Sequence, residues 1–248
     1  MRTRFWILLL LLVLVPSWGR ADITEITGQR LAAGSPTGVD SKTFAYPGNT
    51  VSGHLLVLCY AGWQAAVMPA STTITDTQGN TWTKVETHDG SRTRYGIAYT
   101  VTTSNAANTV TINPEGALAY ISAAITEFAG QNSPVQDVIG TPAIGTSTSP
   151  SMTLTTGTTS ALMVGVMTDN GTVNTNIVSG SGWTTIGEIE DGATVERLSC
   201  QTKTATTASS YTVNWTITSA LWGVHAVSFI PATTSPPTAI PRRRPIYQ

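Results

Sequence analysis

The stretch that decides the fold is His54-Leu55-Leu56-Val57-Leu58, which recurs later in the chain as Ala161-Leu162-Met163-Val164-Gly165. Both copies are apolar on consecutive residues, which is typical of a β-strand buried on both faces. Three further segments of copy one also have a match in copy two, in the same order along the chain. They are Asn80-Thr81-Trp82-Thr83 with Ser181-Gly182-Trp183-Thr184, Asp89-Gly90 with Asp191-Gly192, and Ala124-Ile125-Thr126 with Ala226-Val227-Ser228. The sequence therefore indicates one β-rich unit that has been duplicated.

Each copy carries the same series of short strand signals. An Asp-Gly pair between two alternating runs predicts a hairpin, because both turn positions need positive φ. We expect strands at 55–60, 81–87, 94–101, 109–112 and 120–128 in copy one, and at 162–167, 183–190, 196–203, 211–217 and 222–230 in copy two. Weaker signals lie at 23–31, 42–46, 135–139 and 151–155.

No window has convincing helical periodicity, so we predict an all-β fold: a jelly-roll-like β-sandwich built from two sequence-related repeats. Repeat one covers about 22–130 and repeat two about 131–231. Apolar residues between the copies argue against a linker, and we favour an arrangement in which both copies contribute strands to each sheet. Two separate domains are the alternative.

The two ends of the chain differ in composition from its middle. Arg2 and Arg4 precede an apolar run from Phe5 to Val15, and small residues follow, which predicts a signal peptide over 1–21. The run is too short for a transmembrane helix, which needs about 20 residues. Residues 232–248 are rich in Pro, Thr and Ser and contain Arg242-Arg243-Arg244, so a disordered tail is expected there. We therefore expect a secreted or cell-surface protein without a membrane span.

Charged residues make up only 11% of the chain, against about 25% in ordinary globular domains. From Ala21 onward the chain has 14 acidic and 10 basic residues. This balance gives no basic patch for phosphate contacts, so nucleic acid is not an expected partner. Two cysteines, Cys59 and Cys200, lie in predicted strands. They leave two alternatives open: a disulfide, or two buried free thiols.

Motifs for catalysis or metal binding are few. His54, His88 and His225 have no partner at metal-ligand spacing, and a Gly-x-Ser-x-Gly motif is absent. Glu188 and Glu190 alternate on one strand about 7 Å apart, a separation that a glycoside hydrolase could use, but a solvated strand end is the favoured interpretation. The oxygen-rich turns at Asp76 and Asp169 do not match a calcium loop, and Asx turns account for them. We therefore predict no catalytic residues, no metal and no cofactor.

One difference between the copies suggests a binding surface. Matching the two Asp-Gly turns aligns Tyr95, Ile97, Tyr99 and Val101 with Arg197, Ser199, Gln201 and Lys203. Because the second set is polar, its face should meet water, and the first set would then form an exposed apolar stripe suited to sugar stacking or self-association. The alternatives are that the N-terminal segment covers the stripe, or that the register differs by one residue and exchanges the faces. Trp63, predicted in a loop, is a further candidate. The predicted ligand-binding residues are Tyr95, Tyr99 and Trp63.

Three motifs of copy one, at Gly53-His54-Leu55-Leu56-Val57, at Asp76 to Trp82 and at Ala123 to Gly130, resemble a β-sandwich module of bacterial secreted and phage-associated surface proteins. The resemblance covers most of the mature chain but rests on structural residues, and copy two departs from it at Val178 to Gly182. It implies a β-sandwich, often an accessory or surface part, and carries over no catalytic residues.

We therefore expect a secreted, non-catalytic binding or surface-structural module. Extracellular polysaccharide is the favoured ligand class, and another surface protein is also a candidate partner. The alternatives are a secreted polysaccharide-active hydrolase and a self-assembling coat or appendage subunit.

Overall fold

The computed structural model describes most of the chain between the predicted signal peptide and the predicted tail. The described residues are 22–35, 37–64, 69–115, 120–130, 135–170, 176–189 and 197–231. The predicted signal peptide at 1–21 and the predicted tail at 232–248 lie outside them.

Repeat one folds into a β-sandwich of two antiparallel sheets. Its inner sheet has the order β1-β9-β4-β7-β6, with β2 also paired to β9, and its outer sheet has the order β3-β8-β5. The inner strands are β1 (Thr24–Glu25), β2 (Leu31–Gly34), β4 (Leu55–Trp63), β6 (Thr83–His88), β7 (Thr93–Val101) and β9 (Tyr120–Ala129). The outer strands are β3 (Lys42–Ala45), β5 (Thr72–Asp76) and β8 (Thr109–Pro114).

Repeat two has the same arrangement. Its inner sheet runs β10-β18-β13-β16-β15, with β11 also paired to β18, and its outer sheet runs β12-β17-β14. The inner strands are β10 (Val135–Ile139), β11 (Ala143–Ser147), β13 (Leu162–Asp169), β15 (Thr184–Ile189), β16 (Arg197–Thr204) and β18 (Ala220–Ile230). The outer strands are β12 (Ser151–Thr155), β14 (Val178–Ser179) and β17 (Ser210–Thr216).

The two strand orders confirm the all-β fold and the duplication. From β2 to β9, and from β11 to β18, successive strands alternate between inner and outer sheets as in a jelly roll, except that β6 and β15 lie beside their hairpin partners in the inner sheets. Strands β1 and β10 are additional inner strands. Every sheet takes its strands from one repeat. The expectation that both copies contribute to each sheet is therefore wrong, because hydrogen bonding closes within a repeat and the repeats meet through side chains.

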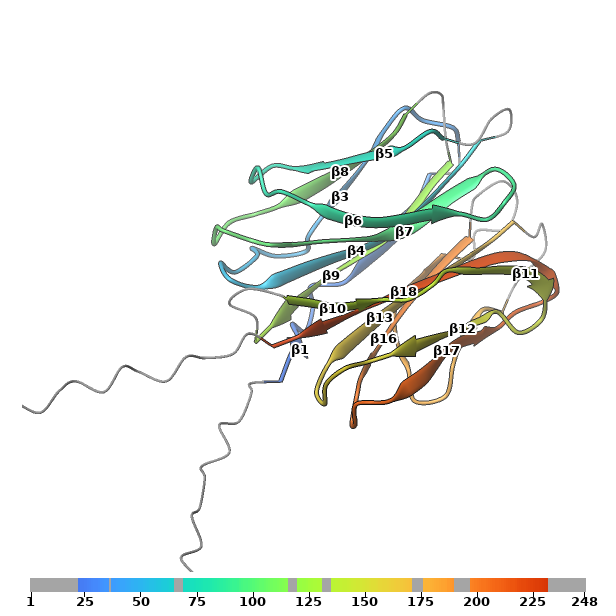
Figure 1. The fold of residues 1–248 in the computed structure, drawn as a ribbon. Helices are drawn as coiled ribbons and strands as arrows, with labels where there is room; N and C mark the ends of the chain where they lie inside the picture. The colour runs from blue at the N-terminus through green and yellow to red at the C-terminus, as the bar shows by residue number, and fades with distance from the viewer. Residues whose placement is uncertain are drawn as a thin grey trace, which may run out of the picture.

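The two sandwiches stack with their inner sheets face to face, which gives four layers in the order outer, inner, inner, outer (Figure 1). A core lies between each adjacent pair of layers. The central core contains side chains from both inner sheets, and a separate core fills each sandwich. Each inner sheet is thus covered on both faces.

Strand β4 shows why its sequence is continuously apolar. Leu55, Val57 and Cys59 point into the central core, and Leu56 and Leu58 point into the core of repeat one. All five are fully buried. In a strand, successive side chains point to opposite faces, so a strand between two cores needs apolar residues at every position. The predicted two-sided burial is confirmed.

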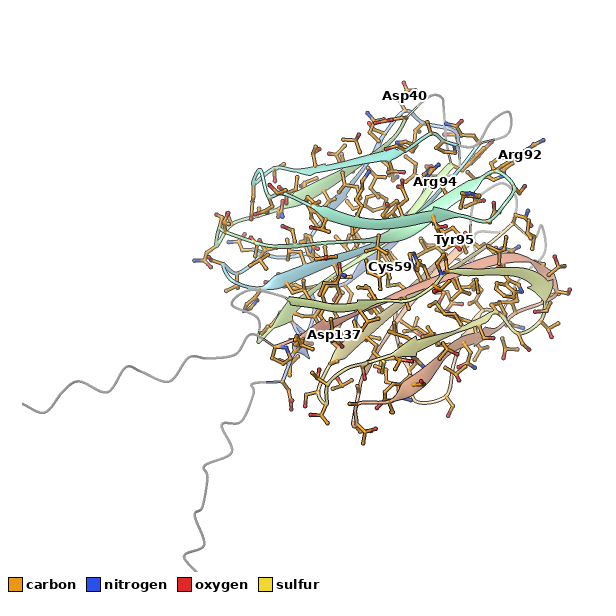
Figure 2. The ribbon with its side chains drawn as sticks, viewed as in Figure 1. Asp40, Cys59, Arg92, Arg94, Tyr95 and Asp137 are labelled. Carbon is orange, nitrogen blue, oxygen red and sulfur yellow. A yellow bond between two sulfur atoms is a disulfide. The ribbon has the colours of Figure 1, made fainter. Side chains whose placement is uncertain are left out.

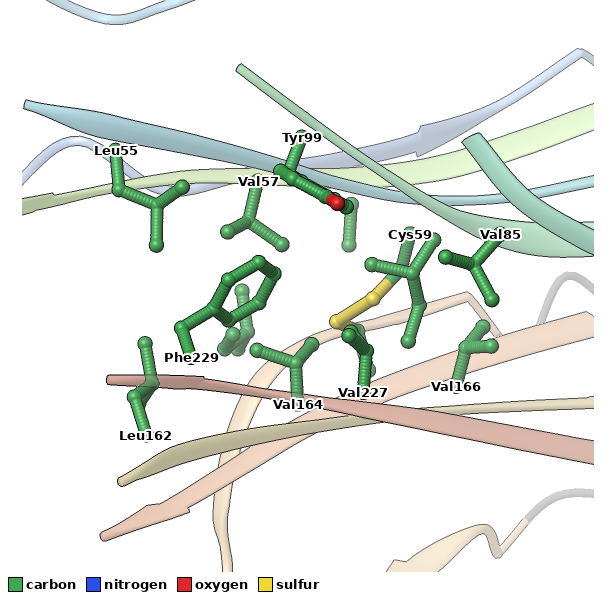
Figure 3. Close-up of a cluster of buried hydrophobic side chains, with 14 of the residues drawn as sticks. Leu55, Val57, Cys59, Val85, Tyr99, Leu162, Val164, Val166, Val227 and Phe229 are labelled. Carbon is green, nitrogen blue, oxygen red and sulfur yellow. A yellow bond between two sulfur atoms is a disulfide. The ribbon is translucent and has the colours of Figure 1, made fainter. Parts of the chain in front are cut away.

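A disulfide between Cys59 and Cys200 crosses the central core and joins the two repeats (Figure 3). Both residues are fully buried, and 141 positions separate them in the chain. Of the two alternatives left open by the sequence, the structure has the disulfide. It is consistent with an oxidising, extracellular environment.

Small residues set how closely the inner sheets approach. A Cβ atom on Gly187 of β15 would lie 2.7 Å from the Cβ atoms of Ala32 and Ala124 in repeat one. A Cβ atom on Gly223 of β18 would lie 2.5 Å from the ring of Tyr95. Any side chain at either glycine therefore has to push the sheets apart.

Replacing Gly187 with Ala should lower the free energy of unfolding by about 1–3 kcal/mol, the usual cost of overpacking a core. Glycine within a strand otherwise destabilises a protein by about 0.5–1 kcal/mol relative to Ala. If the sheets could separate freely, Gly187→Ala would therefore raise the free energy of unfolding. Urea unfolding measures the change, with Gly157→Ala as control because a Cβ there meets only the Asp137 carboxylate, at 3.4 Å. A Gly187→Ala variant as stable as the parent would contradict the close approach.

The double variant Cys59→Ala/Cys200→Ala should lose about 5 kcal/mol of stability, because the chain-entropy model assigns that cost to releasing a closed loop of more than 100 residues. Urea unfolding under oxidising conditions gives the difference. The unmodified protein in reductant is the matched control and should unfold at the same urea concentration as the double variant. If reduction leaves its unfolding midpoint unchanged, the disulfide does not hold the repeats together.

Candidate functional site

The predicted binding stripe on β7 is buried between the repeats (Figure 2). Tyr95 is fully buried, and Tyr99 is only 8% exposed. The Tyr99 hydroxyl donates to Gln136 Oε1 at 2.6 Å, and its ring meets the edge of Phe229 with centroids 4.8 Å apart. Burial raises the pKa of both phenols. The expectation that Tyr95 and Tyr99 meet water is wrong, since the inner sheet of repeat two covers them.

The error comes from a shift of one residue between the copies. Ile97 lies opposite Cys59 on β4, and Cys200 lies opposite Val166 on β13. Ile97 therefore corresponds to Cys200 and not to Ser199. The one-residue register difference that the sequence left open is the actual arrangement, and it exchanges the faces.

Three members of the polar set of repeat two, Arg197, Ser199 and Gln201, are buried as well, inside their own sandwich, and Lys203 is half-buried. Arg197 pairs with Asp169 at 2.6 Å, and Ser199 Oγ accepts a hydrogen bond from Trp215 Nε1 at 3.0 Å. Gln201 donates to Asn214 O at 3.2 Å. Polar residues can line a buried face when each has a partner, so their polarity does not indicate solvent.

Trp63, the third predicted site residue, lies at the end of β4 and not in a loop. It is half-buried, as is Tyr120 at the start of β9, its partner in the strand register. Their ring centroids are 5.2 Å apart with planes tilted by 48°. We call Trp63 and Tyr120 the aromatic pair. Sequence reasoning found one member and missed the other, because Tyr120 becomes its neighbour only through the pairing of β4 with β9.

The motif from Asp76 to Trp82 has a structural role. Asp76 Oδ1 accepts the Asn80 backbone N–H at 2.9 Å. Asp76 Oδ2 accepts from Asn80 Nδ2, Trp82 Nε1 and Asn108 Nδ2 at 2.7, 3.2 and 3.0 Å. A cation would have to displace these donors. Within the described ranges, no group of three His, Cys, Asp or Glu side chains could hold a metal ion.

Glu127, in the third motif of the resemblance, is a fully buried carboxylate. Its Oε1 accepts the Val51 backbone N–H at 2.8 Å and lies 2.7 Å from His54 Nδ1. Burial, together with the nearby charges of Glu127 and Asp76, raises the pKa of the Tyr46 phenol. These contacts gather the motifs of copy one at one end of its sandwich. Repeat two has Ser228 and Ala161 at the positions of Glu127 and His54, so this cluster belongs to repeat one alone.

The two carboxylates considered for glycoside hydrolysis are not both described. Glu188 lies half-buried on β15, opposite Ser199. Glu190 lies outside the described residues. Their predicted separation of about 7 Å, which rests on strand geometry, stays a prediction.

His225 is the most buried histidine, 4% exposed on the face of β18 that carries Val227 and Phe229 into the central core. Its Nε2 lies 3.1 Å from Gly140 O. Burial lowers its pKa, and the hydrogen bond to Gly140 partly offsets the decrease. His225 is therefore a neutral core residue.

His225 should make the fold sensitive to acid. In the unfolded chain, His225 takes up a proton near its ordinary pKa of about 6.5. In the folded chain it takes up this proton only at lower pH, so the free energy of unfolding falls as the pH drops below about 6.5. In His225→Gln, unfolding free energies measured in urea at several pH values should decline less over this range. His88→Gln, at an exposed residue, is the control and should keep the parental pH dependence. Equal pH dependence in the parent and His225→Gln would exclude the role.

Among the described residues, the structure contains no helix that could cross a membrane. No protein-family model, curated protein or solved structure gives a significant match to this chain.

Proposed function

We propose that the protein is an exported, non-catalytic binding or surface-structural module that binds extracellular polysaccharide at the aromatic pair, Trp63 and Tyr120. The observation that carries the proposal is that both residues are only half-buried at strand ends, whereas the central-core tyrosines Tyr95 and Tyr99 are buried.

The chemistry of the aromatic pair suits an uncharged ligand. The C–H face of a sugar ring is apolar and weakly positive, and it can stack on the negative face of an aromatic ring. The low charge of the chain, 11%, offers little for a strongly ionic ligand. Strands β4 and β9 are hydrogen-bonded neighbours along their full length, so the pair is held on a rigid support.

Export is supported by two independent features. The first residues have the pattern of a signal peptide, and the Cys59–Cys200 disulfide fits an oxidising compartment. The self-assembly alternative loses its proposed surface, because repeat two covers the face that carries Tyr95 and Tyr99.

Replacing Trp63 with Ala should weaken polysaccharide binding by about thirtyfold, which corresponds to about 2 kcal/mol for a central aromatic contact. Tyr120→Ala should also weaken it, because the two rings form one platform. Affinity electrophoresis against a panel of bacterial and plant polysaccharides identifies the ligand, and titration with the best oligosaccharide gives Kd.

The matched control is Tyr211→Ala, which removes a half-buried tyrosine on outer sheet strand β17, away from the pair. It should leave Kd unchanged. Failure of the protein to bind any polysaccharide in the panel, or an unchanged Kd in Trp63→Ala, would reject the carbohydrate proposal.

A further inference from the structure

The side-chain amide of Gln78 lies between two threonine hydroxyls at one end of the repeat-one sandwich. Thr102 Oγ1 donates to Gln78 Oε1 at 2.6 Å, and Gln78 Nε2 donates to Thr50 Oγ1 at 2.8 Å. The two hydroxyl oxygens are 3.5 Å apart. We call Thr50, Gln78 and Thr102 the Thr–Gln cluster.

Three chain segments hold this cluster in place. Thr102 follows β7 and donates its backbone N–H to His54 O at 3.0 Å, while Thr50 donates its N–H to Ala106 O at 3.0 Å. Gln78 lies in the turn after β5 and also donates to Ala106 O, at 2.8 Å. Thr50 is fully buried and Thr102 is 1% exposed, so water has little access to either hydroxyl.

Repeat two shows that the fold does not need this chemistry. Ala205 takes the place of Thr102, because its N–H donates to Ala161 O just as that of Thr102 donates to His54 O. An alanine at the Thr102 position therefore supports the same strand geometry. The Thr102 hydroxyl of repeat one is therefore not required by the strand geometry.

We propose that Thr102 and Gln78 react with each other to form an intramolecular ester. Thr102 Oγ1 attacks Gln78 Cδ, a new Oγ1–Cδ bond forms, the Cδ–Nε2 bond breaks, and the amide nitrogen leaves as ammonia. The hydroxyl proton of Thr102 ends on that ammonia. No electrons are transferred to or from an outside group, and no co-reactant is needed.

The geometry favours this step. A carbonyl carbon lies about 1.23 Å from its oxygen, so Thr102 Oγ1, 2.6 Å from Oε1, is within about 4 Å of Cδ. Holding two reacting groups at such range replaces a bimolecular encounter by an intramolecular one, which is a large rate advantage. The burial of Thr102 and Thr50 then limits the access of water to the ester oxygen.

Thr50 is placed to relay the proton from Thr102 to the leaving nitrogen. Its hydroxyl lies near both the nucleophile and the leaving nitrogen, so it can take the proton of Thr102 and pass one to Nε2. Asn80 Nδ2, 3.4 Å from Gln78 Oε1, is positioned to donate to this oxygen as it gains negative charge.

Glu127 and His54 are positioning residues. Glu127 Oε1 fixes the Val51 backbone N–H, next to Thr50, and His54 O accepts the backbone N–H of Thr102. The pair therefore contacts both hydroxyl-bearing segments, which lie on either side of the Gln78 amide.

Mass spectrometry of the full mature protein tests the proposal. The intact mass of the folded, reduced protein should fall short of the sequence mass by one ammonia. Trypsin separates the partners, because Gln78 and Thr50 lie in peptide 43–84 and Thr102 lies in peptide 95–197. After reduction of the disulfide, the ester should keep these two peptides joined, and mild alkaline hydrolysis should release them.

Variants identify the nucleophile. Thr102→Ala, which copies the residue of repeat two, should restore the full sequence mass, and Thr102→Ser should keep the ammonia loss. Thr50→Ala should slow the loss in a time course after refolding, whereas Thr156→Ala, at a buried threonine of repeat two, should not.

Three results would overturn the proposal. One is a full sequence mass in the folded parent protein. The second is an ammonia loss that persists in Thr102→Ala, and the third is a loss confined to peptide 43–84. The Thr102→Ser variant separates lost chemistry from lost folding, because its hydroxyl should restore the link.

Discussion

The structure depends on the dry contact between the two inner sheets. Each inner sheet buries both of its faces, one inside its own sandwich and one against the other repeat. Separation of the two repeats would therefore expose the residues of the central core. Gly187 and Gly223 let the sheets approach closely, and the Cys59–Cys200 bond makes the association permanent in oxidising conditions. The association of the two repeats therefore contributes to the stability of each.

The two repeats share a frame but have diverged in their polar interiors. Repeat one places Glu127, His54 and Asp76 at one end of its sandwich. Repeat two instead buries the ion pair of Arg197 and Asp169 between its sheets. Buried polar groups of this kind are costly unless they are paired. The different placement of these buried polar groups indicates that the interiors of the two sandwiches diverged separately after the duplication.

Much of the fold follows from the sequence, because a strand buried on both faces has a distinctive local pattern. The strands at Leu55–Trp63 and Leu162–Asp169 are evident from their continuous apolar residues. Strands β5, β11 and β14 were not predicted, since they are short and rich in Thr, Ser and Gly, which also suit loops. The weak signal at 23–31 reaches only the first residue of β2.

The candidate site could be predicted only in part. The stripe containing Tyr95 and Tyr99 was recognised as unusual, but its cover comes from a distant segment and its register depends on a one-residue offset between the copies. Trp63 is a candidate from the sequence because it is an aromatic residue in a predicted loop after the first apolar strand. Its partner Tyr120, and the neighbours of Gln78, are set by long-range pairing that no local pattern encodes.

The position of the disulfide has a mechanical consequence. Cys59 and Cys200 enclose a segment with 141 positions of sequence separation, so tension applied to the two ends of the folded region cannot extend that segment while the bond is intact. Only the strands outside it, β1 to β3 and part of β4 on one side and β17 and β18 with part of β16 on the other, can be drawn out. Under load the molecule would lengthen by a limited amount and then resist further extension.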